Sequence, residues 1–203
     1  MPAHSRLACS ATGKDRRRSV DGQQHRGVCR FDVFFVRPFD VSHITRDSKV
    51  RLERVPEAID AGKIPHRDWC ATAARLLKVS PPTYPAPDYV GNVITWTRPN
   101  AVAMCKRIEA ATGRHWVAAI ANHKRFSEYM TYGTFVERAL QGDSQHYFDD
   151  SRLCHSYWEY ESLREESFGS FVDSLQKDQV AIGIQSISQT PAEILRDYLA
   201  ESA

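Results

Sequence analysis

The sequence has 203 residues, of which 42% are hydrophobic and 26% charged, so it predicts one folded domain with its own core and argues against a two-domain enzyme. A net charge of only +2 excludes a chain-wide basic field, and nucleic acid is not expected as a partner. Nowhere do about 18 consecutive apolar residues occur, so we expect no membrane span and a cytoplasmic location.

The first 30 residues differ from the rest in charge. They carry seven Lys or Arg side chains against two acids, whereas the remaining 173 residues carry 20 basic and 23 acidic side chains. Residues 1–27 hold too few large apolar side chains to bury a helix or strand face, so we expect a disordered basic tail there and an ordered domain over 28–203. No apolar stretch follows the run Arg16–Arg18, which favours a solvated tail over an export signal and leaves a transit peptide open.

The cysteines do not form a recognisable framework. They are odd in number and widely spaced and include no C-x-x-C pair, which argues against disulfides and against structural zinc. We therefore expect reduced thiols at Cys9, Cys29, Cys70, Cys105 and Cys154.

The first half of the ordered region predicts two β–α units. A β-branched and aromatic run predicts a buried strand over 28–36, which Pro38 ends. Apolar residues at helical spacing predict a helix over 66–79. Residues 89–96 are strand-like, and a further helix is predicted from Pro99 to Gly113.

The second half is richer in helical patterns. Helices are predicted over 116–122, 128–140 and 162–176, and an alternating strand over 180–187. A capping box with proline at the first helical position predicts the last helix over 191–200. The whole pattern is typical of an α/β domain with an irregular, helical C-terminal part.

Asp32 is an acid inside an apolar strand, which requires a partner. Such a carboxylate pairs with a cation, caps neighbouring backbone or holds a metal. On residue type alone, a structural partner such as Arg37 is favoured over a metal, because buried acids are usually paired.

The residues around Asp32 resemble a known sequence motif. The segment 31–40 (FDVFFVRPFD) resembles the stretch of GT-A nucleotide-sugar glycosyltransferases in which an Asp-x-Asp motif ends a strand before an apolar run. Over about residues 28–187 the chain looks like a bacterial family of uncharacterised, glycosyltransferase-like proteins. The motifs that carry this resemblance are PHRDW at 65–69, NVITW at 92–96, TGRHW at 112–116 and, most specifically, the SEYMTYG block of FSEYMTYGTFV at 126–136.

The resemblance implies a partial GT-A-like, Rossmann-related fold, with a nucleotide-sugar donor and a saccharide acceptor as partners. In that fold paired aspartates hold Mn²⁺ or Mg²⁺, which bridges the donor diphosphate. Here Arg30 occupies the place of the first aspartate and only Asp32 remains. The elements expected before this strand, which build the nucleotide pocket, are replaced by the basic head, so the chain is interpreted as the C-terminal part of such a domain and is expected to bind donor weakly.

The remaining candidate residues follow from the same resemblance, each beside a simpler structural role. Glu128 is a candidate acid or base toward an acceptor hydroxyl, or merely a favourable charge at a helix start. His155 has the late position of a metal-binding histidine, although a lone histidine is more often structural. The candidate substrate-binding residues, which core packing or turn chemistry would also explain, are Asp88, Asn92, Trp96 and Trp158.

The acidic pair Asp149–Asp150 is interpreted as part of an exposed loop rather than a metal site. The function expected from the whole sequence is sugar transfer from a nucleotide-diphosphate donor to a saccharide, and the incomplete Asp-x-Asp motif leaves open whether this chain is active. The alternative is a non-catalytic binding or scaffold protein that keeps the fold.

Overall fold

A computed structural model describes residues 31–201, apart from the side chains of Phe31, Asp32, Leu199 and Glu201. The predicted disordered tail over 1–27 lies outside the described residues. Within the described part the fold is mixed α/β, with three small sheets and six α-helices, so the predicted fold class is confirmed at this level. No helix of this part is long and apolar enough to cross a membrane.

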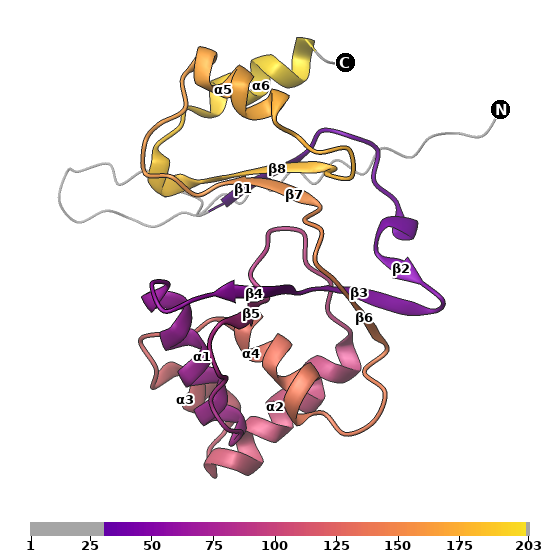
Figure 1. Cartoon of the computed structure of the whole chain (residues 1–203), viewed down its shortest axis with the longest axis vertical. Helices are drawn as coiled ribbons and strands as arrows, with labels where there is room; N and C mark the ends of the chain where they lie inside the picture. Colours follow the sequence, from indigo (N-terminus) through magenta and orange to yellow (C-terminus); the bar gives the residue numbers. More distant parts are fainter. Residues whose placement is uncertain (1–30, 202–203) are drawn as a thin grey trace, which may run out of the picture.

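One sheet joins the two ends of the described chain. It contains β1 (Phe31–Phe35), β7 (Cys154–Tyr157) and β8 (Ala181–Gln185) in the order β1-β8-β7. β8 is antiparallel to β1 and parallel to β7. The helices α5 (Glu165–Asp173) and α6 (Ala192–Glu201) cover one face of this sheet (Figure 1). A short 3₁₀ helix, Ser186–Ser188, leads from β8 toward α6.

The other half of the molecule contains two more small sheets. One consists of β2 (Thr45–Arg46), β3 (Lys49–Glu53) and β6 (His146–Asp149), and the other of β4 (Val55–Ile59) and β5 (Ala86–Asp88). A 3₁₀ turn, Val41–His43, leads into β2. Because β3 and β6 are parallel, everything between them forms one long crossover that carries four helices.

These four helices build the larger core. They are α1 (Ile64–Leu77), α2 (Arg98–Thr112), α3 (Trp116–Ala121) and α4 (Glu128–Thr134), which continues into a π-helical turn at Phe135–Ala139. Leu76, Leu77, Ile108 and Tyr132 are almost fully buried at their contact. Removing such apolar surface from water supplies the main stabilisation of this half.

The two halves meet across the face of β7 and β8 that α5 and α6 leave open. Residues 89–97, which we call the connecting segment, rise from β5 toward this face and return to α2 (Figure 1). Val93 of this segment packs with Cys154 of β7 and Ala181 of β8 in a small buried cluster. The connecting segment is therefore the part of the helical half that touches the sheet.

The helices agree with the sequence prediction, whereas some strands do not. The predicted strand over 89–96 is wrong: regular pairing ends at Asp88, and the connecting segment is held by side chains instead. The first strand is a sheet edge rather than a buried strand, since β1 pairs only with β8 and Phe35 is 51% exposed. The C-terminal part is also less helical than expected, because it contains β7 as well as β8.

The close approach of α4 to Tyr89 yields a stability prediction. A Cβ added at Gly133 would overlap the ring of Tyr89, whereas one added at Gly169 of α5 would meet no atom within 4 Å. We expect Gly133→Ala to cost about 1–3 kcal/mol of unfolding free energy, through overpacking of a buried contact. Gly169→Ala is the matched control and should gain about 0.5–1 kcal/mol from helix propensity. Urea unfolding of both variants checks this, and equal effects would contradict it.

Candidate functional site

A group of buried charges lies where β3, β5 and the β6–β7 connection meet. We call Arg51, Glu53, Asp88 and Arg152 the charged cluster. Arg51 and Glu53, which are 2% and 3% exposed, approach to 3.7 Å between Nη1 and Oε2. The Nε atom of Arg152 lies 3.9 Å from Oε1 of Glu53. Both distances exceed hydrogen-bond length, so the carboxylate is surrounded by cations without being closely bonded to them.

Arg51 links β3 to the end of β6 and to the β6–β7 connection. Its Nη2 donates to the backbone carbonyl of Ser151, and its Nε lies 3.7 Å from Oδ2 of Asp149. Asp149 also accepts hydrogen bonds from the amide and hydroxyl of Ser151. The prediction that Asp149 belongs to an exposed loop is wrong, because the residue ends β6 and faces Arg51.

The two acids of the charged cluster differ in protonation. Burial raises the pKa of Glu53 to about 7 against the opposing pull of Arg51 and Arg152, and the negative charge of Asp88 adds to the rise. Burial also acts to raise the pKa of Asp88, but contact with His66 and a hydrogen bond from the Val90 amide keep it below its usual value. Glu53 is thus the acid that titrates near neutrality.

His66, at the start of α1, is the partner of Asp88. Its Nδ1 lies 3.0 Å from Oδ2 of Asp88, a close polar contact without hydrogen-bond alignment. The imidazole packs against the ring of Trp69 with centroids 4.6 Å apart. Asp88 itself is 3% exposed. It is therefore too buried for the direct substrate contact that the sequence predicts, and could affect a substrate only by orienting neighbouring residues.

Asn92 extends from the connecting segment onto the open face of the sheet. Its Nδ2 donates to Oγ of Ser156 in β7 at 2.8 Å, and it lies so close to Gly183 of β8 that a Cβ there would meet Nδ2 at 2.5 Å. Val33 of β1 pairs with Gly183 in the sheet. Asn92 therefore contacts the central strand of the sheet next to the strand that carries Asp32.

Trp96 belongs to a second group, which we call the aromatic surface and define as Trp96, Tyr129 and Tyr132. The Trp96 ring is 38% exposed and stacks on Tyr132 with centroids 4.8 Å apart and planes 14° apart. Tyr129 meets the same ring edge-on at 6.1 Å. Glu128, exposed in the first turn of α4, precedes Tyr129 directly.

Tyr132 gives the aromatic surface a fixed base. Its hydroxyl accepts a hydrogen bond from the amide of Thr97 at 3.0 Å and lies 2.8 Å from Nε2 of His146. The other ring nitrogen of His146 lies 2.8 Å from the carbonyl of Val50. Burial lowers the pKa of His146, so the neutral ring bridges the tyrosine and β3. The exposed Trp96 ring consequently rests on a rigid support.

Of the two predicted metal residues, the structure describes only the side chain of His155, and this side chain lies apart from these groups. His155 belongs to the same strand as Ser156 but faces α5, where it stacks on Phe171 at 4.3 Å and its Nε2 lies 2.8 Å from Oγ of Ser174. Burial lowers the pKa of this imidazole. Asp32 pairs with Ile184 in the sheet, but its side chain lies outside the described residues.

The described side chains do not by themselves fit a divalent metal. Across residues 31–201, no three His, Cys, Asp or Glu side chains among those described come together as metal ligands would. His155 is already engaged by Ser174 and lies on the opposite face of the sheet from Asn92. The Mn²⁺ or Mg²⁺ ion therefore stays a prediction.

Two other residues considered in the sequence analysis, Arg37 and Trp158, form hydrogen bonds that stabilise the fold. Arg37, considered as a partner of Asp32, donates from Nη1 to the carbonyls of Gln176, Lys177 and Gln179 and so fastens the loop before β8. Trp158 is 37% exposed at the end of β7, and its carbonyl accepts a hydrogen bond from Gln185.

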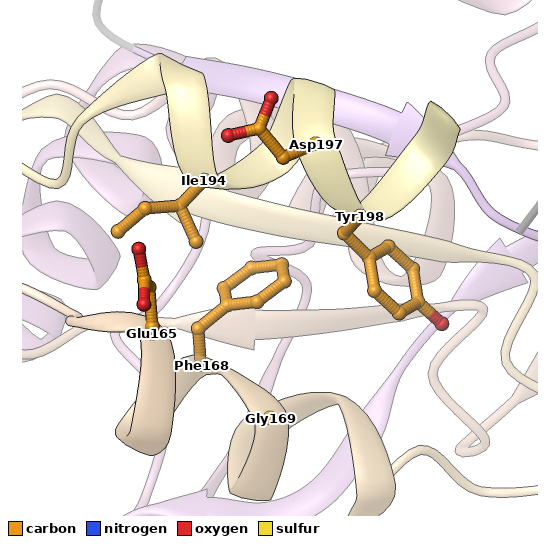
Figure 2. Close-up of a pocket in the computed structure, with 6 residues that line it drawn as sticks. All are labelled: Glu165, Phe168, Gly169, Ile194, Asp197 and Tyr198. Carbon is orange, nitrogen blue, oxygen red and sulfur yellow. The ribbon is translucent and has the colours of Figure 1, made fainter. Parts of the chain in front are cut away.

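A separate cavity of about 450 Å³ lies between α5 and α6. Figure 2 shows Phe168 and Ile194 facing each other across it, with Glu165 beside them and Tyr198 on the neighbouring turn. Phe168 and Tyr198 pack edge to face at 5.6 Å. This cavity is on the far side of the sheet from Asn92 and contains none of the residues that the sequence singled out.

Three important residues escaped the sequence prediction. Arg51 and Glu53 alternate with apolar residues in a stretch that was not assigned as a strand, and such alternation ordinarily marks a solvent-facing edge. His66 occurs in the sequence within the PHRDW motif at 65–69, which by itself assigns it no role. Proximity of His66 to the buried Asp88 depends on the antiparallel pairing of β4 with β5, which the sequence did not predict.

Together, the fold and these groups define a mixed α/β protein whose halves meet at a buried charged cluster. The sequence profile of a family of unknown function, DUF6492, matches residues 28–201, and the chain belongs to that family. No curated protein and no solved structure matches the chain.

Proposed function

We propose that the chain is a glycosyltransferase-like protein that binds a saccharide acceptor at the aromatic surface and takes the sugar from a nucleotide-diphosphate donor. The observation that carries this proposal is the exposed Trp96 ring, which lies flat on Tyr132 and meets Tyr129 edge-on, the tyrosine on which the charge of Glu128 acts. The relation to the GT-A fold rests on the sequence resemblance over about residues 28–187.

The chemistry of this surface suits a sugar. Aromatic rings present an apolar face on which the C–H face of a pyranose can lie, and a neighbouring carboxylate accepts hydrogen bonds from its hydroxyls. Because Tyr132 already fixes the Trp96 ring, little side-chain freedom remains to be lost on binding. Burial and the charge of Glu128 raise the pKa of Tyr129, so its hydroxyl stays a donor.

In the proposed reaction an acceptor hydroxyl oxygen forms a bond to the anomeric carbon of the donor sugar. The bond from that carbon to the diphosphate breaks, and the nucleoside diphosphate leaves with the electron pair. Glu128 accepts the proton of the attacking hydroxyl. Asn92 and Trp158 are proposed as additional saccharide contacts, and Asp88 as a residue that orients its neighbours.

Donor binding is expected to be weak. Arg30 stands where the Asp-x-Asp motif of GT-A enzymes has its first carboxylate, and this cation would repel a metal while it could meet the diphosphate directly. Asp32 is proposed as the remaining metal or diphosphate contact. A calorimetric titration with nucleotide diphosphates plus Mn²⁺ should give weaker than micromolar affinity.

Replacing Glu128 tests the transfer reaction. We expect Glu128→Gln to lower donor turnover about 10²-fold or more, because the amide cannot take a proton from the acceptor. Glu165→Gln is a matched control, since Glu165 also lies in the first turn of a helix, on α5. Product formation is measured with nucleotide-diphosphate sugars and saccharide acceptors at saturating donor. Equal turnover by both variants and the unaltered chain would remove Glu128 from the reaction.

A second candidate function is saccharide binding without catalysis. The observation that favours it is the engagement of His155 by Ser174 and Phe171, on the face of the sheet away from Asn92. In that case saccharides bind at the aromatic surface, and donor is neither bound nor consumed.

A further inference from the structure

Glu53 is pressed against the backbone of the connecting segment. A Cβ at Gly91 would meet Oε1 of Glu53 at 2.6 Å and both Cδ and Oε2 at 2.8 Å, so nothing larger than glycine fits there. Glu53 is 3% exposed, and its Oε1 has no hydrogen-bond partner among residues 31–201. A buried carboxylate in such a position is costly when ionised and much less so when protonated.

Charged and titratable groups face Glu53 from every neighbouring element. Arg51 lies beside it on β3, Arg152 approaches from the β6–β7 connection, Asp88 acts from β5, and the thiol of Cys154 lies on β7. The two cations stop 3.7 and 3.9 Å away, and within the described part of the chain Nε of Arg51 is also without a hydrogen-bond partner. The ionised carboxylate is therefore incompletely compensated in this arrangement.

Arg152 and Gly91 determine how the structure can respond when Glu53 becomes ionised. Arg152 is 35% exposed and so can move closer to the carboxylate, whereas Arg51 is already held by Ser151 and Asp149. On the side of Gly91 the backbone leaves no room beside the carboxylate for water, so water can solvate that side of the ionised group only if the backbone moves. Solvating the ionised form consequently displaces the connecting segment.

We propose that Glu53 is a proton-controlled latch on the connecting segment: the protonated side chain seats the segment between the halves, and ionisation releases it. Release loosens Asn92 from Ser156 and Thr95 from the carbonyl of Arg51, and Trp96 follows them in the chain. The latch is a property of the fold and does not depend on which ligand the aromatic surface binds.

The direction of the pH effect follows from the pKa of Glu53. Folding raises it from the ordinary 4.5 to about 7, so the folded state binds the proton more tightly than the unfolded chain. The contribution of protonated Glu53 to stability is complete below about pH 4.5 and is lost as the pH rises through about 7. The segment is accordingly expected to be seated in mildly acidic solution and released in mildly basic solution.

Amide hydrogen exchange at about pH 6 and about pH 8, corrected for intrinsic rates, measures the latch in the full chain. We expect protection of residues 89–97 to fall about tenfold between these conditions, in line with the ionised fraction of a group of pKa near 7. Glu53→Gln, which is permanently neutral, should keep the segment protected at both pH values.

Glu137→Gln is the control, because Glu137 also touches the connecting segment, through Tyr89, yet hydrogen bonds with Arg54 and Tyr89 overcome burial and lower its pKa. It should retain the pH step of the unaltered chain. Gly91→Ala pushes the segment away from Glu53 and should reduce its protection at both pH values. A pH step that persists in Glu53→Gln would overturn the proposal. The proposal would also be overturned if protection of the segment in the unaltered chain did not change with pH. The same holds if Gly91→Ala had the same protection as the unaltered chain at about pH 6.

Discussion

Arg51→Met is expected to lower the free energy of unfolding by about 3–5 kcal/mol in mildly basic solution, where Glu53 is ionised, because Glu53 and Asp149 then both lose a buried cationic partner. Arg51 is 2% exposed and is placed among Glu53, Asp149 and the carbonyl of Ser151. After substitution Glu53 keeps only Arg152 as a nearby cation, and the carbonyl of Ser151 loses a charged donor. Urea unfolding monitored by circular dichroism measures the loss.

Lys49→Met is the matched control on the same strand. Lys49 faces Asp143 at 3.6 Å with both side chains roughly half exposed, and such a pair contributes about 0–1 kcal/mol. Combining Arg51→Met with Glu53→Leu should restore part of the stability, since an apolar pair can replace a buried ion pair. A loss below about 1 kcal/mol for Arg51→Met would show that the cluster is solvated in solution.

Trp96→Ala is expected to weaken saccharide affinity at least about tenfold, which corresponds to about 1.4 kcal/mol of binding free energy. The indole provides the exposed face of the aromatic surface, and no described side chain stacks on its outer side. Calorimetric titration with neutral oligosaccharides measures the change.

Trp116→Ala controls for the general loss of an exposed tryptophan. Trp116 is 37% exposed on α3, nearly the same fraction as Trp96, and follows α2 in the chain, whereas Trp96 precedes it. Its removal should leave saccharide affinity unchanged. A similar fall in both variants would indicate a nonspecific effect on the helical core.

The helices could be predicted because local signals mark them. Proline within the first turn and a left-handed residue at the end bound both α1 and α2, and Gly113 occupies that last position in α2. The Ser127 hydroxyl caps α4 by accepting from the Met130 amide. Such signals lie within a few residues of each other and are visible in the chain itself.

The short strands could not be predicted in the same way. β3 and β6 each owe their existence to a parallel partner almost a hundred residues away, and both carry charged residues that suggest a loop. In the connecting segment the reverse holds: Val93, Ile94 and Trp96 favour a strand by composition. Side-chain bonds from Asn92 and Thr95 hold that segment in an irregular path instead.

The candidate site was partly predictable. Trp96 and the helix that begins at Glu128 were singled out, and the structure brings the Trp96 ring onto Tyr129 and Tyr132 of that helix. The charged cluster is not predictable from the sequence, because its burial depends on how the β6–β7 connection crosses β3. Three-dimensional packing alone turns Arg51 and Glu53 into buried groups.

The most direct test of the saccharide site follows the indole N–H resonances of the four tryptophans during titration with a neutral oligosaccharide. Each indole reports on a different place: Trp69 on α1, Trp96 on the aromatic surface, Trp116 on α3 and Trp158 after β7. We predict a saturable shift of the Trp96 resonance, with those of Trp69 and Trp116 unchanged. Saturable binding that leaves the Trp96 resonance unmoved, or no binding to the unaltered chain, would contradict the account.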